Sequence, residues 1–265
     1  MNNAEPDRSR PAVGVAYAVF VYLVFVAVSA YALGFFADLV TPTTIDGTPA
    51  RDAMSAAAVD LLLLAAFALQ HSVMARPSFK RAWIRVVPAA SERSTYVLSA
   101  CLTLGLLMWA WQPVGPTLYH AHGQVRGVLL VLQGVGWLLV IRSTFLVSHT
   151  QLFGLPSAPS SSRPGAGAPP ALVERSCYRY VRHPLMTGFL IVFWSASDLT
   201  AGHLLLALAM TLYVRIGTAL EEQDLVAVHG ADYVSYQARV PALLPVRIFR
   251  RERRPSPPVG AASPF

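Results

Sequence analysis

Charged side chains are scarce in this sequence of 265 residues and make up only 13% of it, about half the share usual in soluble globular proteins. Among its 21 basic residues, Lys80 is the single lysine. Hydrophobic residues account for 54%, which is more apolar surface than a soluble fold of this size can bury. The composition therefore excludes a soluble Rossmann-type enzyme and a disordered chain, and it indicates an integral membrane protein.

Cysteine is nearly absent as well. Cys101 lies within an apolar run and Cys177 within a basic segment, so the two provide neither a disulfide framework nor a metal-ligand spacing. The histidines show no HxxxH or HExxH pattern, and we predict no metal site.

Long apolar runs dominate what is present. Four of them can each form a helix of roughly the length that crosses a bilayer core of about 30 Å: Val13–Ala37, Ala53–Met74, Tyr96–Trp111 and Val125–Ser148. A fifth run, Leu185–Val214, is interrupted near Asp198. Because a carboxylate at the centre of a single span is costly, we expect two short helices joined near Asp198.

These runs predict an all-α, polytopic membrane helix bundle. It has about four full spans, a C-terminal helical hairpin, and an amphipathic cytoplasmic helix that continues the hairpin from Gly217 to Tyr236. We expect residues 1–155 to form the N-terminal transmembrane helices and 156–171 a flexible Pro/Gly/Ser linker. Residues 172–246 then form the hairpin and the cytoplasmic helix, and 247–265 a basic and then disordered tail.

The distribution of basic residues predicts the orientation. Arginine and lysine are concentrated in 75–95, in 149–183 and in the tail, whereas 112–124 contains neither. Basic loops stay on the cytoplasmic side, so we expect a multi-pass protein of the cell membrane with both termini cytoplasmic. The net charge of +7 follows from this bias and does not indicate a nucleic-acid partner.

A basic cluster precedes the fifth apolar run. Arg182 and His183 stand directly before Pro184, a residue favoured at the first position of a helix. Two basic side chains and unpaired backbone N–H groups would then meet at a helix N-terminus, which suits a small carboxylate or phosphate. The alternative is a basic loop that touches anionic lipid headgroups.

An acidic cluster follows the same run. Glu221, Glu222 and Asp224 lie beside a membrane surface that favours cations, so they suit a cationic ligand; the alternative is a solvated helix face. Because a hairpin returns to the side on which it started, the two clusters should lie close together. A zwitterionic ligand with an additional positive charge fits between them.

Two further polar sites lie within apolar runs. Arg142 shares a helix face with Phe145 and His149, and it either serves a ligand or extends its side chain toward the cytoplasmic interface. For Gln70 and His71 we favour interhelical hydrogen bonds over a ligand site.

Several motifs resemble one known family. They are RHPLM at Arg182–Met186, EEQDL at Glu221–Leu225, HGADYVSYQARVPALLP at His229–Pro245, QHSVMARPSFK at Gln70–Lys80, ERSTY at Glu92–Tyr96 and QLFGL at Gln151–Leu155. The first three resemble the C-terminal signature of the isoprenylcysteine carboxyl methyltransferase superfamily. The others are similar to its methanethiol S-methyltransferase and NnrU-like branch. One departure is Met186, where the superfamily often has an aromatic residue.

The resemblance implies that S-adenosylmethionine is the methyl donor. It implies the following cofactor-binding residues: Tyr178, Arg182, His183, Pro184, Glu222, Tyr233 and Tyr236. It also places Arg142 against the acceptor, and makes Arg142, Glu221 and His183 the candidate catalytic residues.

The implied reaction is in-line methyl transfer to a small thiol, foremost methanethiol, which gives dimethyl sulfide. Arg142 would stabilise the thiolate, and either Glu221 or His183 would accept the proton. Membrane lipid and the thiol are the expected partners. The alternatives are another thiol, a lipid-borne carboxylate as in isoprenylcysteine methylation, or an NnrU-like membrane protein without catalysis.

Overall fold

The computed structural model describes residues 9–89, 91–146, 174 and 176–244. The predicted linker 156–171 and tail 247–265 lie outside the described residues, as does His149. The helices and strands are α1 (Ser9–Ala37), α2 (Ala53–Ala75), α3 (Pro77–Trp83), α4 (Glu92–Ala110), β1 (Thr117–His120), α5 (Gly123–Leu146), the 3₁₀ helix η1 (Ser176–Arg179), α7 (Pro184–Trp194), β2 (Asp198–Thr200), α8 (Ala201–His229) and α9 (Ala231–Arg239).

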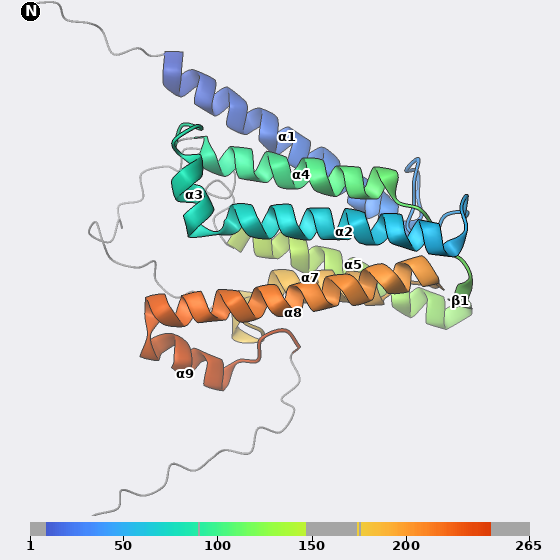
Figure 1. Ribbon diagram of the computed structural model, residues 1–265. Helices are drawn as coiled ribbons and strands as arrows, with labels where there is room; N and C mark the ends of the chain where they lie inside the picture. The colour runs from blue at the N-terminus through green and yellow to red at the C-terminus, as the bar shows by residue number, and fades with distance from the viewer. Residues whose placement is uncertain (1–8, 90, 147–173, 175, 245–265) are drawn as a thin grey trace, which may run out of the picture.

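The predicted all-α membrane bundle is confirmed. Among the described helices, α1, α2, α5 and α8 are long and apolar enough to cross a membrane. The 19-residue α4, the third expected span, lies alongside α1 and α2 in the same layer (Figure 1). Helix α1 begins and α8 ends at the same end of the bundle, as an even number of crossings requires.

The C-terminal hairpin turns at Asp198, as predicted. Helix α7 has 11 residues and α8 has 29, so the second helix does continue beyond the apolar run, as expected, but it ends at His229 and not near Tyr236. The Thr200 side chain caps α8 by accepting a hydrogen bond from the His203 backbone N–H. No proline interrupts the helix before Gly230, whose φ of 58° ends it.

The amphipathic segment 217–236 is therefore divided between two helices and not continuous. Its first part belongs to α8, and its second part begins α9 after the turn at Gly230. The turn folds α9 back against α8 at the end of the bundle (Figure 1). This packing buries Tyr233, Tyr236 and Val240 against Leu225 and Val226.

A two-stranded sheet at the opposite end was not predicted. Strands β1 and β2 pair antiparallel, with Thr117 opposite Thr200 and His120 opposite Asp198. The Asp198 carboxylate accepts hydrogen bonds from His120 Nδ1 at 2.7 Å and from Arg126 at 3.1 Å. Asp198 is thus paired at the turn of the hairpin, which removes the cost that an isolated charge would carry there.

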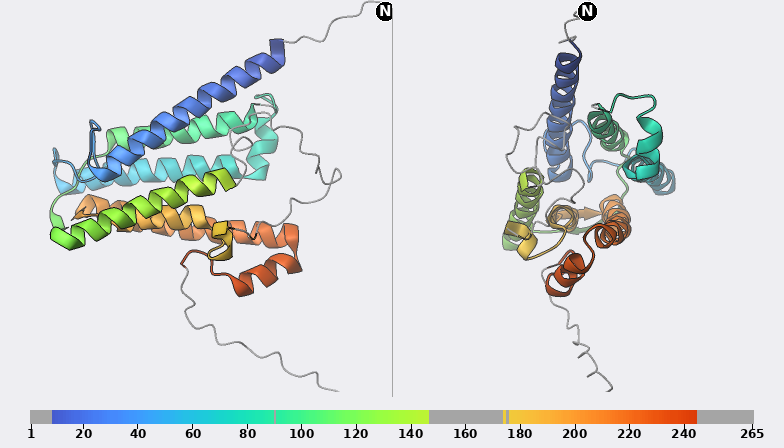
Figure 2. Two further views of the ribbon diagram at one scale, coloured as in Figure 1. Left: turned by 180° about the vertical axis from the view of Figure 1, so that it is seen from behind. Right: turned by 90° about the vertical axis from the view of Figure 1, so that its left-hand side faces the viewer.

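Helices α5 and α7 approach each other closely at two glycines. A Cβ added to Gly188 would lie 2.8 Å from the carbonyl oxygen of Gly136, and one added to Gly136 would lie 2.9 Å from that of Gly188. Seen from behind, α7 lies directly beside α5 (Figure 2). This contact sets the distance between α5 and the start of the hairpin.

The interhelical hydrogen bonds expected for Gln70 and His71 are confirmed. Thr103 on α4 donates to Gln70 Oε1 at 2.9 Å, and the hydroxyl of Tyr96 on α4 lies 3.0 Å from His71 Nε2. Both contacts join α2 to α4, so they tie together the N-terminal half of the bundle.

Candidate functional site

Arg182 and Glu222 form a largely buried ion pair where the hairpin returns. The Arg182 Nε atom donates to Glu222 Oε1 at 2.7 Å, and the Arg182 and Glu222 side chains are only 9% and 18% exposed. Arg182 also donates to the carbonyl oxygens of Gln237 and Val240. The pair therefore joins the start of α7, the end of α8 and the end of α9.

His183 extends this network toward solvent. Its Nε2 atom lies 3.1 Å from Glu222 Oε1, and its Nδ1 atom lies 3.5 Å from Glu221 Oε2. The His183 side chain is 7% exposed, whereas that of Glu221 is 54% exposed. Glu221 and Asp224 are thus the exposed carboxylates of the acidic cluster, and His183 lies between Glu221 and the more buried Glu222.

The structure corrects one part of the expected anion site. Arg182 and His183 precede α7, and their backbone N–H groups donate to the carbonyl oxygens of Pro241 and Ala242 at 2.9 and 3.0 Å. The two clusters do meet, but Arg182 neutralises Glu222 instead of facing it across a gap. Oppositely charged groups that are buried together pair directly, since an unpaired buried charge is costly.

Three tyrosines surround the network. Tyr233 and Tyr236 are each 2% exposed, and burial raises the pKa of both to about 12. Burial, and then the charge of Glu221, also raise the pKa of Tyr178. The Tyr236 hydroxyl donates to the Tyr178 carbonyl at 2.6 Å, so α9 holds η1 in place through a hydroxyl that stays protonated at neutral pH.

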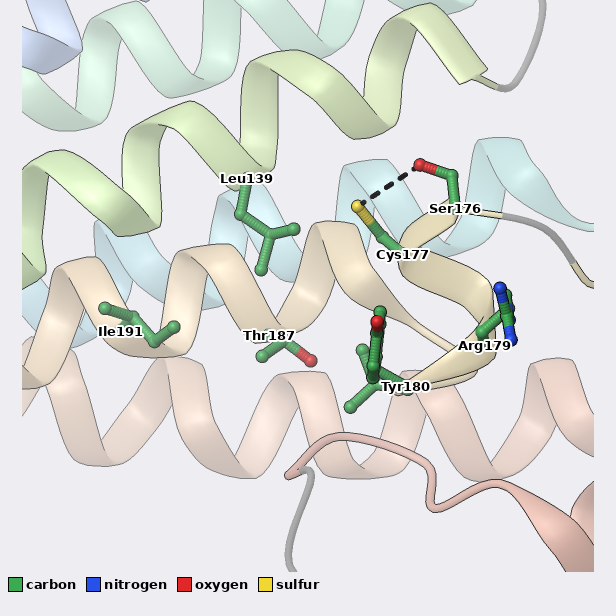
Figure 3. Close-up of a pocket in the computed structure, with 8 residues that line it drawn as sticks. Leu139, Ser176, Cys177, Arg179, Tyr180, Thr187 and Ile191 are labelled. Atoms are coloured by element: carbon green, nitrogen blue, oxygen red, sulfur yellow. Dashed lines mark hydrogen bonds between the residues drawn. The ribbon is translucent and has the colours of Figure 1, made fainter.

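A pocket of about 400 Å³ opens beside this network, between α5, η1 and α7. Its walls are mostly apolar, and its lining includes Leu139, Cys177, Thr187 and Ile191 (Figure 3). Thr187 follows His183 by one helical turn and donates to its carbonyl oxygen at 3.1 Å. The pocket therefore reaches to within one turn of the charged network.

Arg142 lies at the edge of the same region. Its guanidinium donates to Ser176 Oγ at 3.4 Å, and Ser176 lines the pocket. Ser176 adopts a φ of 60°, a conformation that is costly for a residue other than glycine and that is common at functional sites. Arg142 is exposed and, among the described residues, makes no ion pair with Glu221 or Glu222.

The structure thus brings together most of the residues predicted from the sequence. Tyr178, Arg182, His183, Glu221 and Glu222 form one network with α9, while Arg142 is linked to it only through η1.

Sequence reasoning missed three polar residues of this region. Gln237 donates to Glu222 Oε2 at 3.2 Å, Thr187 lines the pocket, and Thr218 lies buried three and four residues before the two glutamates. Helical spacing from Glu222 was the available signal for Thr218.

Comparisons with known proteins match most of the chain. The NnrU protein family model matches residues 61–232. The chain is 44% identical over 249 residues to methanethiol S-methyltransferase 2 of Bradyrhizobium diazoefficiens, which covers 92% of the chain and 96% of the relative. It is 43% identical to a methanethiol S-methyltransferase of a Pseudomonas species, over 88% of the chain and 90% of that protein.

A more distant relative is nurim of Rattus norvegicus, 34% identical over 66% of the chain and 70% of that protein. No solved structure matches the chain. The family match spans the helices α2 to α8 that build and surround the charged network, and with the relatives that match nearly end to end it shows that this chain belongs to the NnrU family.

Proposed function

We propose that this protein is a membrane enzyme that transfers a methyl group from S-adenosylmethionine to a small thiol, foremost methanethiol, to give dimethyl sulfide. The observation that carries the proposal is the identity of 40 to 44% to several relatives named methanethiol S-methyltransferase, over 86% or more of the chain. The protein would lie in the cell membrane with both termini in the cytoplasm.

The residues around Glu222 fit this cofactor in their chemistry. Carboxylates suit its ammonium and sulfonium groups, and the imidazole of His183 and the guanidinium of Arg182 suit its carboxylate. The buried Thr218 hydroxyl has no hydrogen-bond partner among the described residues, which leaves one polar group available for a ligand. When bound, the cofactor supplies a methyl group that is already activated on a sulfonium.

The protein must then provide a thiolate in the right place. A simple thiol has a pKa above the cysteine reference of about 8.5, so only a few per cent or less is ionised at pH 7. Glu221 is the better placed proton acceptor, because its side chain is 54% exposed while His183 Nε2 already faces Glu222.

The apolar pocket between α5, η1 and α7 suits the acceptor. Leu139, Val181 and Ile191 give it an apolar wall, and Arg179 also lines it, so it suits a small apolar thiol that reacts as a thiolate. Arg142, bonded to Ser176 at its edge, supplies a positive charge for the thiolate. This assignment keeps Arg142 on the acceptor side and the Glu221 cluster on the donor side.

The test is incubation of the purified protein in detergent with methyl-labelled S-adenosylmethionine and a panel of thiols, with headspace detection of volatile sulfides. Labelled dimethyl sulfide from methanethiol is the expected product. If only a larger thiol or a prenylated cysteine analogue is labelled, that compound and not methanethiol is the methyl acceptor. If S-adenosylhomocysteine shows no measurable affinity, every methyltransferase assignment fails and a non-catalytic membrane role remains.

A further inference from the structure

Thr218 on α8 carries a buried hydroxyl that the fold does not use. The residue is 6% exposed, and its Oγ1 atom has no hydrogen-bond partner among the residues that the structure describes. Burying a hydroxyl without a partner opposes folding. An uncompensated group of this kind therefore calls for an explanation.

Other helical hydroxyls in this protein do find partners within their own helix. Thr211, two turns earlier on α8, donates to the carbonyl of Ala207 at 2.6 Å. Thr187 on α7 and Ser195, which directly follows α7, also donate to the carbonyl four residues before them. This bond is the usual way to satisfy a hydroxyl inside a helix, and Thr218 does not make it.

The position of Thr218 connects it to the charged network. It precedes Glu221 by three residues and Glu222 by four, so the three side chains share one face of α8. Val214, one turn earlier, is 5% exposed, whereas Ile216 is 53% exposed, and the face of Thr218 is therefore the one turned toward the bundle. Glu222 on this face contacts Arg182 and His183.

The position of Thr218 along α8 determines which part of a bound ligand it could contact. One helical turn advances about 5.4 Å, so Thr218 lies about one turn deeper in the bundle than the ion pair of Arg182 and Glu222. A ligand whose charged end sits at His183 and Glu222 would bring its nearest polar atoms to this level.

We propose that the Thr218 hydroxyl is a ligand-binding group that accepts a hydrogen bond from the ammonium group at the amino-acid end of the methyl donor. This inference rests on the proposed function and adds a residue that the motifs did not indicate. An ammonium has three N–H donors and no acceptor, and the Thr218 hydroxyl oxygen supplies an acceptor on the face of α8 that also carries the Glu222 carboxylate. Binding then gives the buried Thr218 hydroxyl the hydrogen-bond partner that it lacks among the described residues.

The test compares two ligands on two variants of the purified protein in detergent. Thr218→Val keeps the shape and removes the hydroxyl, while Thr218→Ser retains it. S-Adenosylhomocysteine carries the amino-acid end, and 5′-methylthioadenosine lacks it. We expect Thr218→Val to bind S-adenosylhomocysteine about tenfold more weakly and 5′-methylthioadenosine as the unchanged protein does. Thr218→Ser should stay within about threefold for both.

Thermal unfolding without ligand separates binding from structure. Because the hydroxyl is unpartnered, Thr218→Val should unfold no earlier than the unchanged protein. The matched control is Thr211→Val on the same helix, which loses the bonds to Ala207 and Trp194; it should unfold earlier and leave the affinity for S-adenosylhomocysteine unchanged.

Unchanged affinity of Thr218→Val for S-adenosylhomocysteine would overturn the inference, as would an equal loss for 5′-methylthioadenosine. Those results leave the proposed function standing. Absence of binding by the unchanged protein would overturn the proposed function and the inference together.

Discussion

The side chains around the site differ in how far they are buried and in how many segments they join, and this difference decides which substitutions are informative. Arg182 and Glu222 hold three segments together and are mostly buried. Glu221 and Arg142 are exposed, and within the described part of the chain their polar contacts are long, at 3.5 Å to His183 and 3.4 Å to Ser176. Substitutions at the exposed pair therefore report on chemistry, whereas substitutions at the buried pair report on folding as well.

Replacing Glu221 by Gln removes a proton acceptor and keeps the size of the side chain. We expect turnover at pH 7 to fall by about tenfold or more and to recover partly above pH 8.5, where more of the thiol ionises without help. The measurement is the pH profile of dimethyl sulfide formation at saturating donor. Unchanged turnover at pH 7 would move the role of proton acceptor to His183 or to water.

Arg142→Ala tests the assignment to the acceptor side. The loss of a positive charge near the thiolate should lower turnover and raise the KM for methanethiol, with donor affinity changed by less than about twofold. Steady-state kinetics and titration with S-adenosylhomocysteine measure the two effects separately. A loss of donor affinity with turnover falling only in proportion to occupancy would place Arg142 in the cofactor site.

Arg182→Ala should destabilise the protein as well as weaken donor binding. It leaves the Glu222 carboxylate without its main partner in a site that is 18% exposed, a change that costs about 3 kcal/mol. Thermal unfolding in detergent measures it, and Arg239→Ala is the control. Arg239 pairs with Glu174 at 3.0 Å in an exposed position, where a salt bridge contributes about 0 to 1 kcal/mol. Equal destabilisation by both variants would contradict the structural role of the buried pair.

At the scale of elements, the contact between α5 and α7 positions the pocket. Leu139 and Ile191, which line the pocket, each lie one turn beyond the glycine of their helix that makes this contact. Separation of the helices at Gly136 and Gly188 would therefore widen the pocket and shift the start of α7 with it.

Gly188→Ala should push the two helices apart, because its Cβ would meet the backbone oxygen of Gly136 at 2.8 Å. We expect a loss of stability of about 1 to 3 kcal/mol and a higher KM for methanethiol. Gly134→Ala on α5 is the matched control, since a Cβ there meets nothing within 4 Å; it should be neutral or slightly stabilising. Two variants with the same stability and KM would show that the close contact is dispensable.

For the whole molecule, the functional network lies at the end of the bundle where α1 begins and α8 ends. The basic residues of α3 and of the segment that follows it are at this end too. The positive-inside rule predicts that this end faces the cytoplasm, where a charged and water-soluble methyl donor would be available.

A topology reporter fused after Arg254 should therefore report a cytoplasmic location, and one inserted in the 112–116 segment before β1 a location across the membrane. Paired alkaline phosphatase and green fluorescent protein fusions measure this. An external signal from the fusion after Arg254 would place the network on the far side and contradict the proposed supply of donor.

Much of this protein follows from its sequence alone. Apolar runs longer than a bilayer is thick cannot be hidden in a soluble fold, so the helical bundle, the hairpin turn at Asp198 and the nearness of Arg182 to Glu222 were predictable. These features depend on local composition and on helix periodicity, which act without knowledge of distant contacts.

Only the tertiary structure decided how those parts meet. Helix α8 ends where the turn at Gly230 stands. The sheet forms because β1 and β2 meet across 78 residues of chain. The surroundings of the Arg182–Glu222 pair depend on α9, which folds back so that Arg182 can donate to the Gln237 carbonyl oxygen. The missing partner of Thr218 is likewise a property of its surroundings. Such features arise from packing between segments distant in the chain, and helix propensity and hydropathy carry no information about those contacts.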